Sequence, residues 1–328
     1  MIKIIDRTLT TMDRSLPSGD KLFKFCSMLI KTGVNVIELS TLAFEKMGRT
    51  LPEGVKYILH LNVMESTNGY HQFNSFSSRN SKMDNEPNII NEFQVNDIRE
   101  INSLRQYSNL LNVRITGLDD IMCHDYEHIF GTLKATFKGN IDLCPEDKYN
   151  CATAVAVQWV LSGGKSISCS FAGAGGYACL EEILLALRIS IRHKPNLDLS
   201  VLQDLKKLYQ EITGVNIAPN KAVLGDKIFM VEAGIHADGL LKNPITYEPY
   251  DPKIIGAKRT IVVGKHSGTK AVKMKITELG MKVADSEIKD IISSIQDKSM
   301  EYGRSLTDVE LYDIICEVRA IERKTLYS

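Results

Sequence analysis

Short apolar runs alternate with longer amphipathic stretches through the first 190 residues, and this alternation limits the possible folds more than any other feature. Six runs have the length of buried strands: residues 2–5, 34–39, 57–63, 110–115, 139–143 and 166–171. Four longer stretches space their apolar side chains as helices do: residues 19–32, 124–137, 152–161 and 180–191. Strands that alternate with helices predict a parallel sheet covered by helices, either a closed barrel or an open doubly wound sheet.

Two regions depart from this rhythm. Residues 65–86 are rich in Ser, Asn and Gly, which cannot supply a buried face, so we expect a long loop there. Residues 269–324 carry apolar side chains at helical spacing and predict a small all-helical domain. We therefore divide the chain into a sheet domain (1–230), a linker segment (231–268) and a helical subdomain (269–328).

Composition excludes several classes of protein. The 40 Lys and Arg residues balance 40 Asp and Glu residues, which argues against a polybasic nucleic-acid binder. Seven scattered cysteines without a Cys-x-x-Cys pair predict reduced thiols. No apolar run approaches the roughly 20 residues of a membrane span, and the first residues show no secretory pattern. We expect a cytoplasmic protein with neither a nucleic-acid nor a membrane partner.

Two motifs have ordinary structural explanations. His124 and His128 lie four residues apart on a predicted helix and so share a face, as a zinc-binding pair does. Local bonding or exposure to solvent explains them better. The glycine-rich residues 172–176 lack the Lys-Ser/Thr of a phosphate-binding loop and predict a tight turn from strand to helix.

The most informative stretch covers residues 232–252 and is followed by residues 261–268. It places His236 and Tyr247 eleven positions apart, among turns set by glycine and proline. A histidine exchanges protons near neutral pH, and a tyrosine hydroxyl can polarise a neighbouring group. On these residues alone, a hydrogen-bonded loop that fixes domain packing explains the stretch better, because a single histidine is weak evidence of catalysis.

Residues 219–268 closely resemble the segment that follows the barrel in homocitrate synthases and isopropylmalate synthases, nearest to the nitrogen-fixation type of homocitrate synthase. The resemblance implies a TIM-barrel-like domain, complete or degenerate, followed by a small all-helical subdomain. It also implies dimers that condense acetyl-CoA with a 2-oxo acid on a divalent metal. In that family a His and a Tyr enter the partner chain's site, and His236 and Tyr247 match that pair in identity and spacing.

The amino-terminal motif resembles the family's pattern less well. Residues 6–13 align with Asp-Thr-Thr-Leu-Arg-Asp-Gly-Glu, but Thr10 stands at the catalytic Arg position and Thr11 at a metal-binding acid. Leu143 and Pro145 stand where the family has its two His ligands. A threonine hydroxyl is a weak ligand for a hard cation, and Leu and Pro side chains offer no donor. We therefore expect this chain to bind no metal, any divalent metal being supplied by a partner's site.

The replaced and the retained residues differ in where they act. Positions that serve the chain's own barrel are changed, apart from Glu38, which matches an acidic position near the family's substrate pocket. The pair that acts across the dimer is kept. This favours a subunit of a homocitrate synthase, which joins acetyl-CoA to 2-oxoglutarate, paired with a metal-competent chain or with a second copy of itself. Two alternatives stay open: a catalytically silent binding or regulatory protein, and a stand-alone 2-isopropylmalate or citramalate-type synthase.

Overall fold

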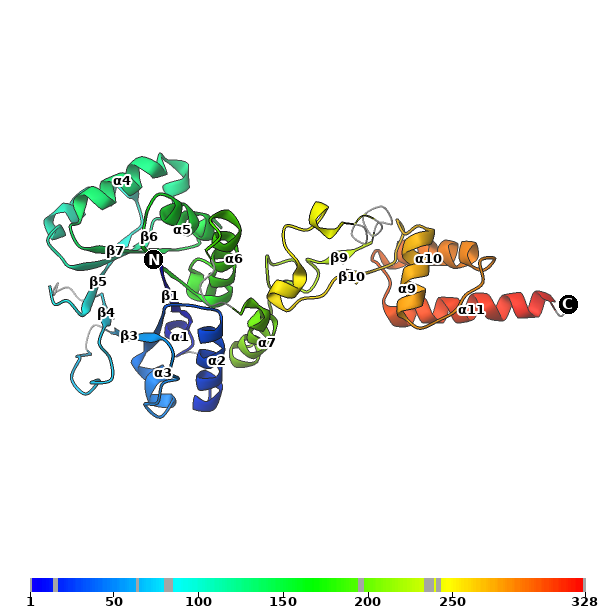
Figure 1. The fold of residues 1–328 in the computed structure, drawn as a ribbon, viewed down its shortest axis with the longest axis horizontal. Coiled ribbons are helices and arrows are strands. Elements are labelled where there is room, and N and C mark those ends of the chain that lie inside the picture. The colour runs from blue at the N-terminus through cyan, green and yellow to red at the C-terminus, as the bar shows by residue number, and fades with distance from the viewer. Residues whose placement is uncertain are drawn as a thin grey trace. The chain divides into compact units, whose positions relative to one another are not determined.

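The computed structural model describes residues 2–13, 17–62, 65–79, 85–193, 198–232, 239 and 243–326. The chain divides into two compact units, Met1–Gly225 and Asp226–Ser328. Figure 1 shows both units, coloured along the chain from blue to red. Each unit has its own core.

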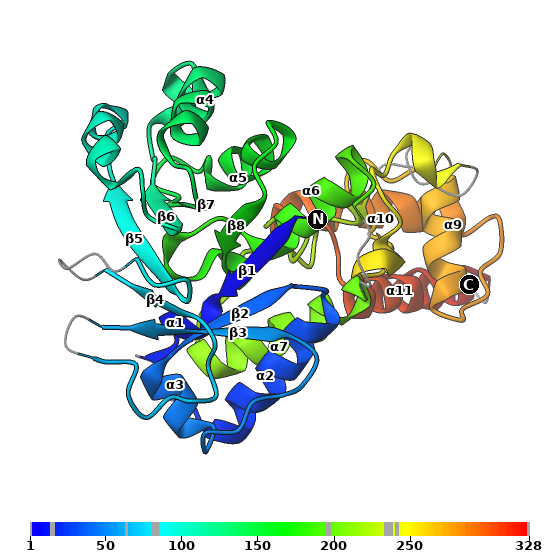
Figure 2. The same cartoon turned by 60° about the vertical axis from the view of Figure 1, so that its left-hand side comes forward.

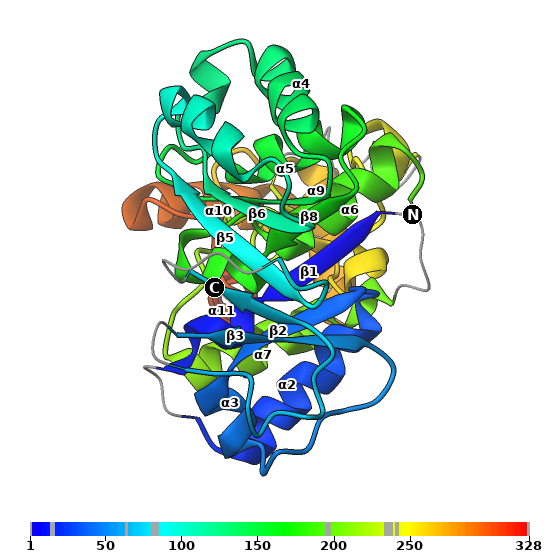
Figure 3. The same ribbon diagram turned by 90° about the vertical axis from the view of Figure 1, so that its left-hand side faces the viewer.

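The first unit is a closed barrel of eight parallel strands (Figure 3). The strands are β1 (Lys3–Arg7), β2 (Val36–Ser40), β3 (Lys56–Leu61), β4 (Phe76–Ser78), β5 (Ile89–Val95), β6 (Asn112–Gly117), β7 (Asn140–Pro145) and β8 (Ser166–Cys169). They pair in chain order, and β8 closes the barrel on β1 with Lys3 opposite Ser166. The prediction of a TIM-barrel-like domain is confirmed, and the open doubly wound alternative is excluded.

Helices cover the outside of the barrel. The α-helices are α1 (Thr8–Thr11), α2 (Gly19–Lys31), α3 (Thr41–Lys46), α4 (Tyr126–Thr136), α5 (Ala152–Leu161), α6 (Leu180–Ser190) and α7 (Leu202–Thr213). Short 3-10 helices lie at Ile98–Tyr107, Ile121–Cys123, Phe171–Gly176 and Leu199–Val201. Helix α3 packs on β2 and β3, and α2 packs on α3 and α7 (Figure 2). Helix α2 buries Leu22, Phe25, Cys26 and Leu29, the spacing expected from the sequence.

The polar stretch at residues 65–86 is only partly a loop, which corrects the sequence prediction. It contains β4, and β5 follows it as a strand that the sequence analysis did not find. Phe73 anchors the stretch by packing edge-on against Phe44, with ring centroids 4.9 Å apart. A three-residue strand is too short to show the alternation on which strand prediction depends. Among the described residues no α-helix follows β3, β4 or β5, so these βα units are degenerate.

Helix α4 begins two residues later than predicted, and this separates the two histidines. His124 lies in the turn before the helix, and its Nε2 is 3.3 Å from Oδ2 of Asp120. His128 lies in the first turn of α4. The expectation that both share one helix face is therefore wrong, whereas local bonding is confirmed for His124.

The glycine-rich stretch forms the predicted tight turn between β8 and α6. Ala172, Gly173 and Gly175 adopt positive φ angles of 58°, 74° and 71°. The backbone N–H of Ala172 donates to Oε2 of Glu181 at 2.9 Å. This bond ties the turn to the helix that follows it.

In its described residues, the second unit combines a two-stranded parallel sheet with the helices α9 (Thr269–Glu278), α10 (Ile288–Tyr302) and α11 (Asp308–Leu326). Strand β9 (Met230–Val231) pairs with β10 (Thr260–Ile261). Short 3-10 helices lie at Pro244–Thr246 and Pro252–Ile255. One apolar cluster holds the unit together and includes Val272, Ile276, Ile291, Ile295, Ile314 and Ile315. The predicted helical subdomain is confirmed.

Two further observations concern the chain as a whole. Within its described residues, no helix is both long and apolar enough to cross a membrane. All seven cysteines are free, as the sequence predicts. Cys26, Cys144, Cys169 and Cys179 are buried.

Asp6, near the end of β1, makes the stability of the barrel depend on pH. Its carboxylate has no exposed surface and accepts hydrogen bonds from the backbone N–H and the hydroxyl of Thr8, at 3.0 and 2.8 Å. Burial raises the pKa of Asp6 to about 7, although the bonds from Thr8 oppose that rise. The folded state then keeps a proton that the unfolded state releases. The free energy of unfolding therefore falls as the pH rises from about 4 to about 7.

Asp6→Asn removes this proton uptake while keeping the shape of the protonated side chain. We expect the variant to gain stability relative to the wild type between about pH 4.5 and about pH 7.5, measured by urea denaturation. Asp20→Asn, in the exposed first turn of α2, is the control and should give a curve parallel to the wild type. Parallel curves for Asp6→Asn and the wild type would contradict the account.

Candidate functional site

The side chains inside the barrel form two layers, because successive residues of a strand point to opposite faces. The layer nearer the amino ends of the strands is apolar and consists of Ile5, Val36, Ile58 and Ile90. Two residues further along the same four strands stand Arg7, Glu38, His60 and Glu92. The half of the interior nearer the carboxyl ends is therefore polar and charged.

Each of the eight strands contributes one side chain to this second layer, which we call the polar ring: Arg7, Glu38, His60, Ser77, Glu92, Arg114, Asp142 and Ser168. Hydrogen bonds and ion pairs join all eight into one network. The interior layers of TIM barrels are usually built from branched apolar side chains. The polar ring therefore distinguishes the interior of this barrel from that of most TIM barrels.

Arg114 lies at the centre of the polar ring and has no exposed surface. Its Nε donates to Oδ2 of Asp142 at 2.6 Å, and its Nη1 donates to Glu38 at 2.9 Å and to Glu92 at 3.3 Å. Its Nη2 lies 2.6 Å from the second carboxylate oxygen of Glu38. A guanidinium carries five N–H donors in a fixed plane, so this one side chain holds three carboxylates in place.

Two further arginines complete the charge balance. Nη2 of Arg7 donates to Oε2 of Glu92 at 3.1 Å and lies 3.4 Å from Glu38. Arg79, just after β4, pairs with the other oxygen of Glu92. The ring contains three carboxylates, those of Glu38, Glu92 and Asp142. Three guanidiniums pair with them, so the formal charges of the two groups cancel.

Burial and charge act in opposite directions on the ring's glutamates. Burial alone would raise the pKa of Glu38 and Glu92, but the neighbouring Arg114 and Arg7 outweigh it. These arginines hold the pKa of Glu38 well below its usual range and lower the pKa of Glu92 to about 2. Both glutamates are therefore ionised at neutral pH and bound by guanidiniums instead of being free to act as bases.

The two threonines that align with catalytic and metal-binding positions lie in α1, at the carboxyl end of β1. The hydroxyl of Thr10 donates to the backbone carbonyl of Arg7 at 2.8 Å. The hydroxyl of Thr11 donates to the carbonyl of Thr8 at 2.7 Å. Both hydroxyl protons are used locally, as is common for threonine in the first turn of a helix.

Leu143 and Pro145, which align with the family's two His ligands, lie in the last half of β7. Asp142 and Cys144 face the interior, where they bond to Arg114 and Arg7. Leu143 stands between them and is fully buried, so alternation turns its side chain toward the helices.

One group of potential metal ligands lies within the polar ring: Glu38, His60 and Glu92, whose ligand atoms are within 4.8 Å of one another. The oxygens of both glutamates are already paired with Arg7, Arg79 and Arg114. A divalent cation there would lie beside two buried guanidiniums in a medium that screens repulsion poorly. The residues present therefore do not fit the divalent metal that the fold family implies.

Cys144 does not change this conclusion. Burial raises the pKa of its thiol to about 11, although Arg7 and Arg114 act against that rise. The sulfur of Cys144 also accepts a hydrogen bond from Nη1 of Arg7 at 3.1 Å, so a metal would have to displace both the thiol proton and this bond.

A second group of potential ligands, Cys179, Glu181 and Glu182, lies at the start of α6. The ammonium of Lys221 occupies it, at 3.2 Å from Sγ of Cys179 and 3.1 Å from Oε1 of Glu182. Lys221 thus supplies the positive charge that this group requires. Burial raises the pKa of Glu181 to about 7 even with this lysine nearby.

The residues expected to act on a partner chain belong to the second unit. His236 lies outside the described residues. Tyr247 is described, and 44% of its surface is exposed. Gly239 packs so closely against Tyr247 that a Cβ at this position would overlap the tyrosine ring. The residue after Tyr247, Glu248, forms a bidentate ion pair with Arg259, with bonds of 2.7 to 2.9 Å. This ion pair braces the turn that carries Tyr247.

Glu232 fixes the start of this segment on the helical subdomain. Its Oε1 accepts the backbone N–H of His266 at 3.0 Å, and its Oε2 accepts the hydroxyl of Ser305 at 2.9 Å. A Cβ on Gly264 would press against the carboxylate of Glu232, at 2.7 Å. Glycine is the residue that leaves room for this anchor.

The closed parallel barrel has the same fold as HMG-CoA lyases of known structure. It superposes on an HMG-CoA lyase from Bacillus subtilis with a TM-score of 0.51 and 16% identity, covering 66% of this chain and 95% of that chain. For an HMG-CoA lyase from Brucella melitensis the TM-score is 0.50 at 12% identity, covering 65% and 99%. At these identities the likeness shows the fold alone.

Sequence comparison carries the identification from fold to family. Residues 223–322 match a family described as homocitrate synthase post-HMGL domain-like. The chain is 30% identical over 337 residues to the homocitrate synthase omega subunit of Clostridium pasteurianum, covering 96% of this chain and 95% of that one. It is 37% identical over 175 residues to homocitrate synthase AksA of Methanopyrus kandleri, covering 52% and 44%. The chain belongs to the homocitrate synthase family, and the resemblance seen in its sequence is confirmed.

The sequence analysis singled out Glu38 but missed the other members of the polar ring. A signal was present in the strands themselves. In β1, β2, β3 and β5 an Ile or Val is followed two residues later by Arg, Glu, His or Glu. A charged residue at the same offset in four apolar strands indicates a shared inward layer.

Replacing Arg114 tests whether the polar ring holds the barrel together. Arg114→Leu leaves Glu38, Glu92 and Asp142 buried without their main counter-charge. We expect the free energy of unfolding, measured by urea denaturation, to fall by about 3–5 kcal/mol. The exposed Arg49 pairs with Glu45 on α3, so Arg49→Leu is the control and should cost less than about 1 kcal/mol. Equal losses for the two variants would contradict a structural role for the ring.

Proposed function

We propose that this chain is a subunit of a homocitrate synthase that performs no condensation on its own barrel and serves a metal-competent partner chain. In this proposal the partner's barrel holds the divalent metal, acetyl-CoA and 2-oxoglutarate. This chain supplies His236 and Tyr247 to that site. The choice of acetyl-CoA and 2-oxoglutarate rests on the family to which the chain belongs.

The polar ring is the observation that carries this proposal. Its glutamates are paired with arginines of the same chain, so a metal or a substrate carboxylate would first have to break a buried ion pair. Breaking such a pair costs roughly 3–5 kcal/mol. For Glu38 in particular we propose a role in holding Arg114, instead of binding substrate.

The retained pair supports the second half of the proposal. A histidine can transfer a proton near neutral pH, and a tyrosine hydroxyl can orient or polarise the acetyl thioester or its base. The ring of Tyr247 is exposed on the second unit, where another molecule can reach it. Two copies of this chain would have the same polar ring in both barrels, so the partner must be a different chain.

The relative from Clostridium pasteurianum also supports a shared enzyme. Its name describes an omega subunit, and the alignment covers 95% of its length. A chain that matches it over almost its whole length is a good candidate for the same division of labour.

Release of CoA from acetyl-CoA with 2-oxoglutarate and a divalent metal tests the proposal. We would assay this chain alone, a metal-competent homologue from the same cell alone, and the two chains co-expressed. We expect this chain alone to be inactive and the pair to be more active than the homologue alone. Activity of this chain alone would revive the stand-alone synthase, and no gain from pairing would favour the silent binding protein.

Variants of the retained pair locate the contribution of this chain within the complex. His236→Ala and Tyr247→Phe should each lower kcat of the pair, by about 100-fold where the group transfers a proton. Tyr302→Phe is the matched control, because Tyr302 is also 44% exposed and lies in the same unit. Size-exclusion chromatography would check that each variant still joins its partner. Full activity of both variants would contradict the proposal.

Gly239→Ala tests the position of Tyr247 without removing it. The added methyl group overlaps the tyrosine ring, so the ring must move. We expect lower activity of the pair with an unchanged urea midpoint for the barrel. Gly131→Ala on α4, where a Cβ meets no atom within 4 Å, should leave activity unchanged. Activity that tolerates Gly239→Ala would show that the position of Tyr247 does not matter.

A further inference from the structure

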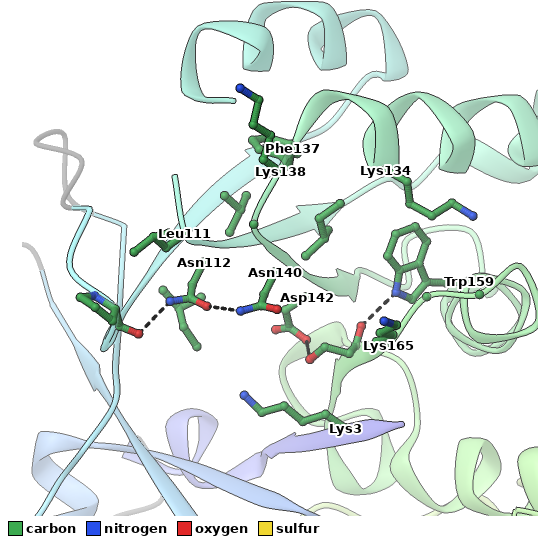
Figure 4. Close-up of a pocket in the computed structure, with 18 residues that line it drawn as sticks. Lys3, Leu111, Asn112, Lys134, Phe137, Lys138, Asn140, Asp142, Trp159 and Lys165 are labelled. Atoms are coloured by element: carbon green, nitrogen blue, oxygen red, sulfur yellow. Dashed lines mark hydrogen bonds between the residues drawn. The ribbon is translucent and has the colours of Figure 1, made fainter. Parts of the chain in front are cut away.

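The amino-terminal end of the barrel holds a cavity of about 900 Å³ that the proposed function does not use. The first residues of four strands line it: Lys3, Asn112, Asn140 and Ser166 (Figure 4). Active sites of TIM barrels lie at the carboxyl ends of the strands, so this cavity is at the opposite end. Its volume falls within the roughly 300–1,000 Å³ of small-molecule sites.

Lysines dominate the charge of this amino-terminal cavity. Lys3, Lys134, Lys138 and Lys165 line it, and an adjoining cavity of about 440 Å³ shares Lys3 and adds Lys56. Lys3 and Lys165 lie on adjoining chain segments, since the backbone N–H of Lys3 donates to the carbonyl of Lys165 at 2.8 Å. Such a group of ammoniums favours a ligand with several negative charges.

The carboxylate that lines the cavity does not neutralise these lysines. Among the described residues that line the two cavities, Asp142 is the one acidic residue, and it lines the larger cavity. Its Oδ2 accepts from Arg114 and Ser168 at 2.6 Å each, and its Oδ1 accepts from Ser166 at 2.8 Å. Its charge is therefore already paired inside the barrel.

Three of the lysines have ammoniums available for a ligand. Lys134 is used, because its Nζ donates to the carbonyl of Ser162 at 2.6 Å. Lys3, Lys138 and Lys165 make no side-chain hydrogen bond or ion pair with any residue that the structure describes. A cavity whose lysines outnumber its one carboxylate, already paired with Arg114, is a site that an anion stabilises.

The remaining wall of the cavity is apolar and firmly held. Leu111, Phe137 and Trp159 line it (Figure 4). The indole N–H of Trp159 donates to the carbonyl of Ser166 at 3.0 Å. A Cβ on Gly164 would overlap the indole, so this position needs glycine. Of these three side chains, Leu111 is 43% exposed and offers an organic group its main contact surface, whereas Phe137 and Trp159 are buried.

We propose that this cavity binds a phosphorylated small molecule, with its phosphate oxygens paired to Lys3 and Lys165 and its organic part against the apolar wall. Lysine ammoniums bind phosphate as point charges, and one phosphate group carries up to about two negative charges where one carboxylate carries a single charge. The cavity exceeds the size of a lone phosphate and leaves room for an organic group of nucleotide size. This proposal does not depend on the proposed function.

Titration calorimetry on the full chain tests this proposal with three probes: inorganic pyrophosphate, ADP and citrate. We expect pyrophosphate and ADP to bind, with citrate at least about tenfold weaker. Lys3→Met with Lys165→Met should weaken ADP binding at least about tenfold, and raising the salt concentration should weaken it too. Lys24→Met with Lys207→Met on α2 and α7 is the matched control and should bind as the wild type does.

Three results would overturn the proposal: no heat with either phosphate probe, citrate binding as tightly as pyrophosphate, or wild-type affinity in the double variant. Lys3 begins β1, so the double variant needs a check of its fold by circular dichroism. Lys165→Met alone changes a residue just before β8 and decides the matter if the double variant does not fold. Loss of ADP affinity in this single variant supports the site, and unchanged affinity rejects it.

Discussion

Arg114 holds three carboxylates inside the barrel, and the rest of the polar ring is arranged around that contact. A guanidinium without exposed surface is tolerated only where its charge and its N–H donors are satisfied. Glu38, Glu92 and Asp142, from three different strands, satisfy them. The contact therefore links β2, β5 and β7 through β6 across the centre of the barrel. Arg7 and Arg79 then balance the charge that one guanidinium leaves.

The same contact occupies the glutamates that could otherwise hold a cation. A condensing site needs acidic or imidazole ligands for a cation and a free positive charge for the substrate. Here the glutamates and the arginines of the interior satisfy one another instead. In the second unit, Glu232–Ser305 and Arg259–Glu248 bonds brace Glu232 and the turn around Tyr247. Both observations agree with the proposal that this chain serves the site of a partner.

Local patterns predicted most of the fold, and long-range contacts account for what they missed. The spacing of Leu22, Phe25 and Leu29 predicted α2, because one helix buries one face whatever the strand order. Barrel closure could not be told from an open sheet, since both give alternating strands and helices. Strand β4 was not predicted, because three residues are too few to show the two-residue alternation of a strand. It is held by pairing with its neighbours β3 and β5.

Part of the candidate site was predicted from the sequence. That part came from the resemblance to a known family more than from the spacing of polar and apolar residues. Arg114 and Glu38 are 76 residues apart, so no window of sequence shows their contact. Tyr247 was singled out because its spacing from His236 matches the pair in the family. His236 lies outside the described residues. The amino-terminal cavity was not predicted, because its lysines belong to segments that come together only when the barrel closes.

The metal content of the purified complex tests the central claim most directly. This chain and its metal-competent homologue would be co-expressed, purified as one complex and analysed for divalent ions by mass spectrometry. The account predicts one tightly bound ion per pair of chains and none in this chain purified alone. An ion bound stoichiometrically to this chain alone would contradict it, because the polar ring would then leave room for the metal that the account excludes.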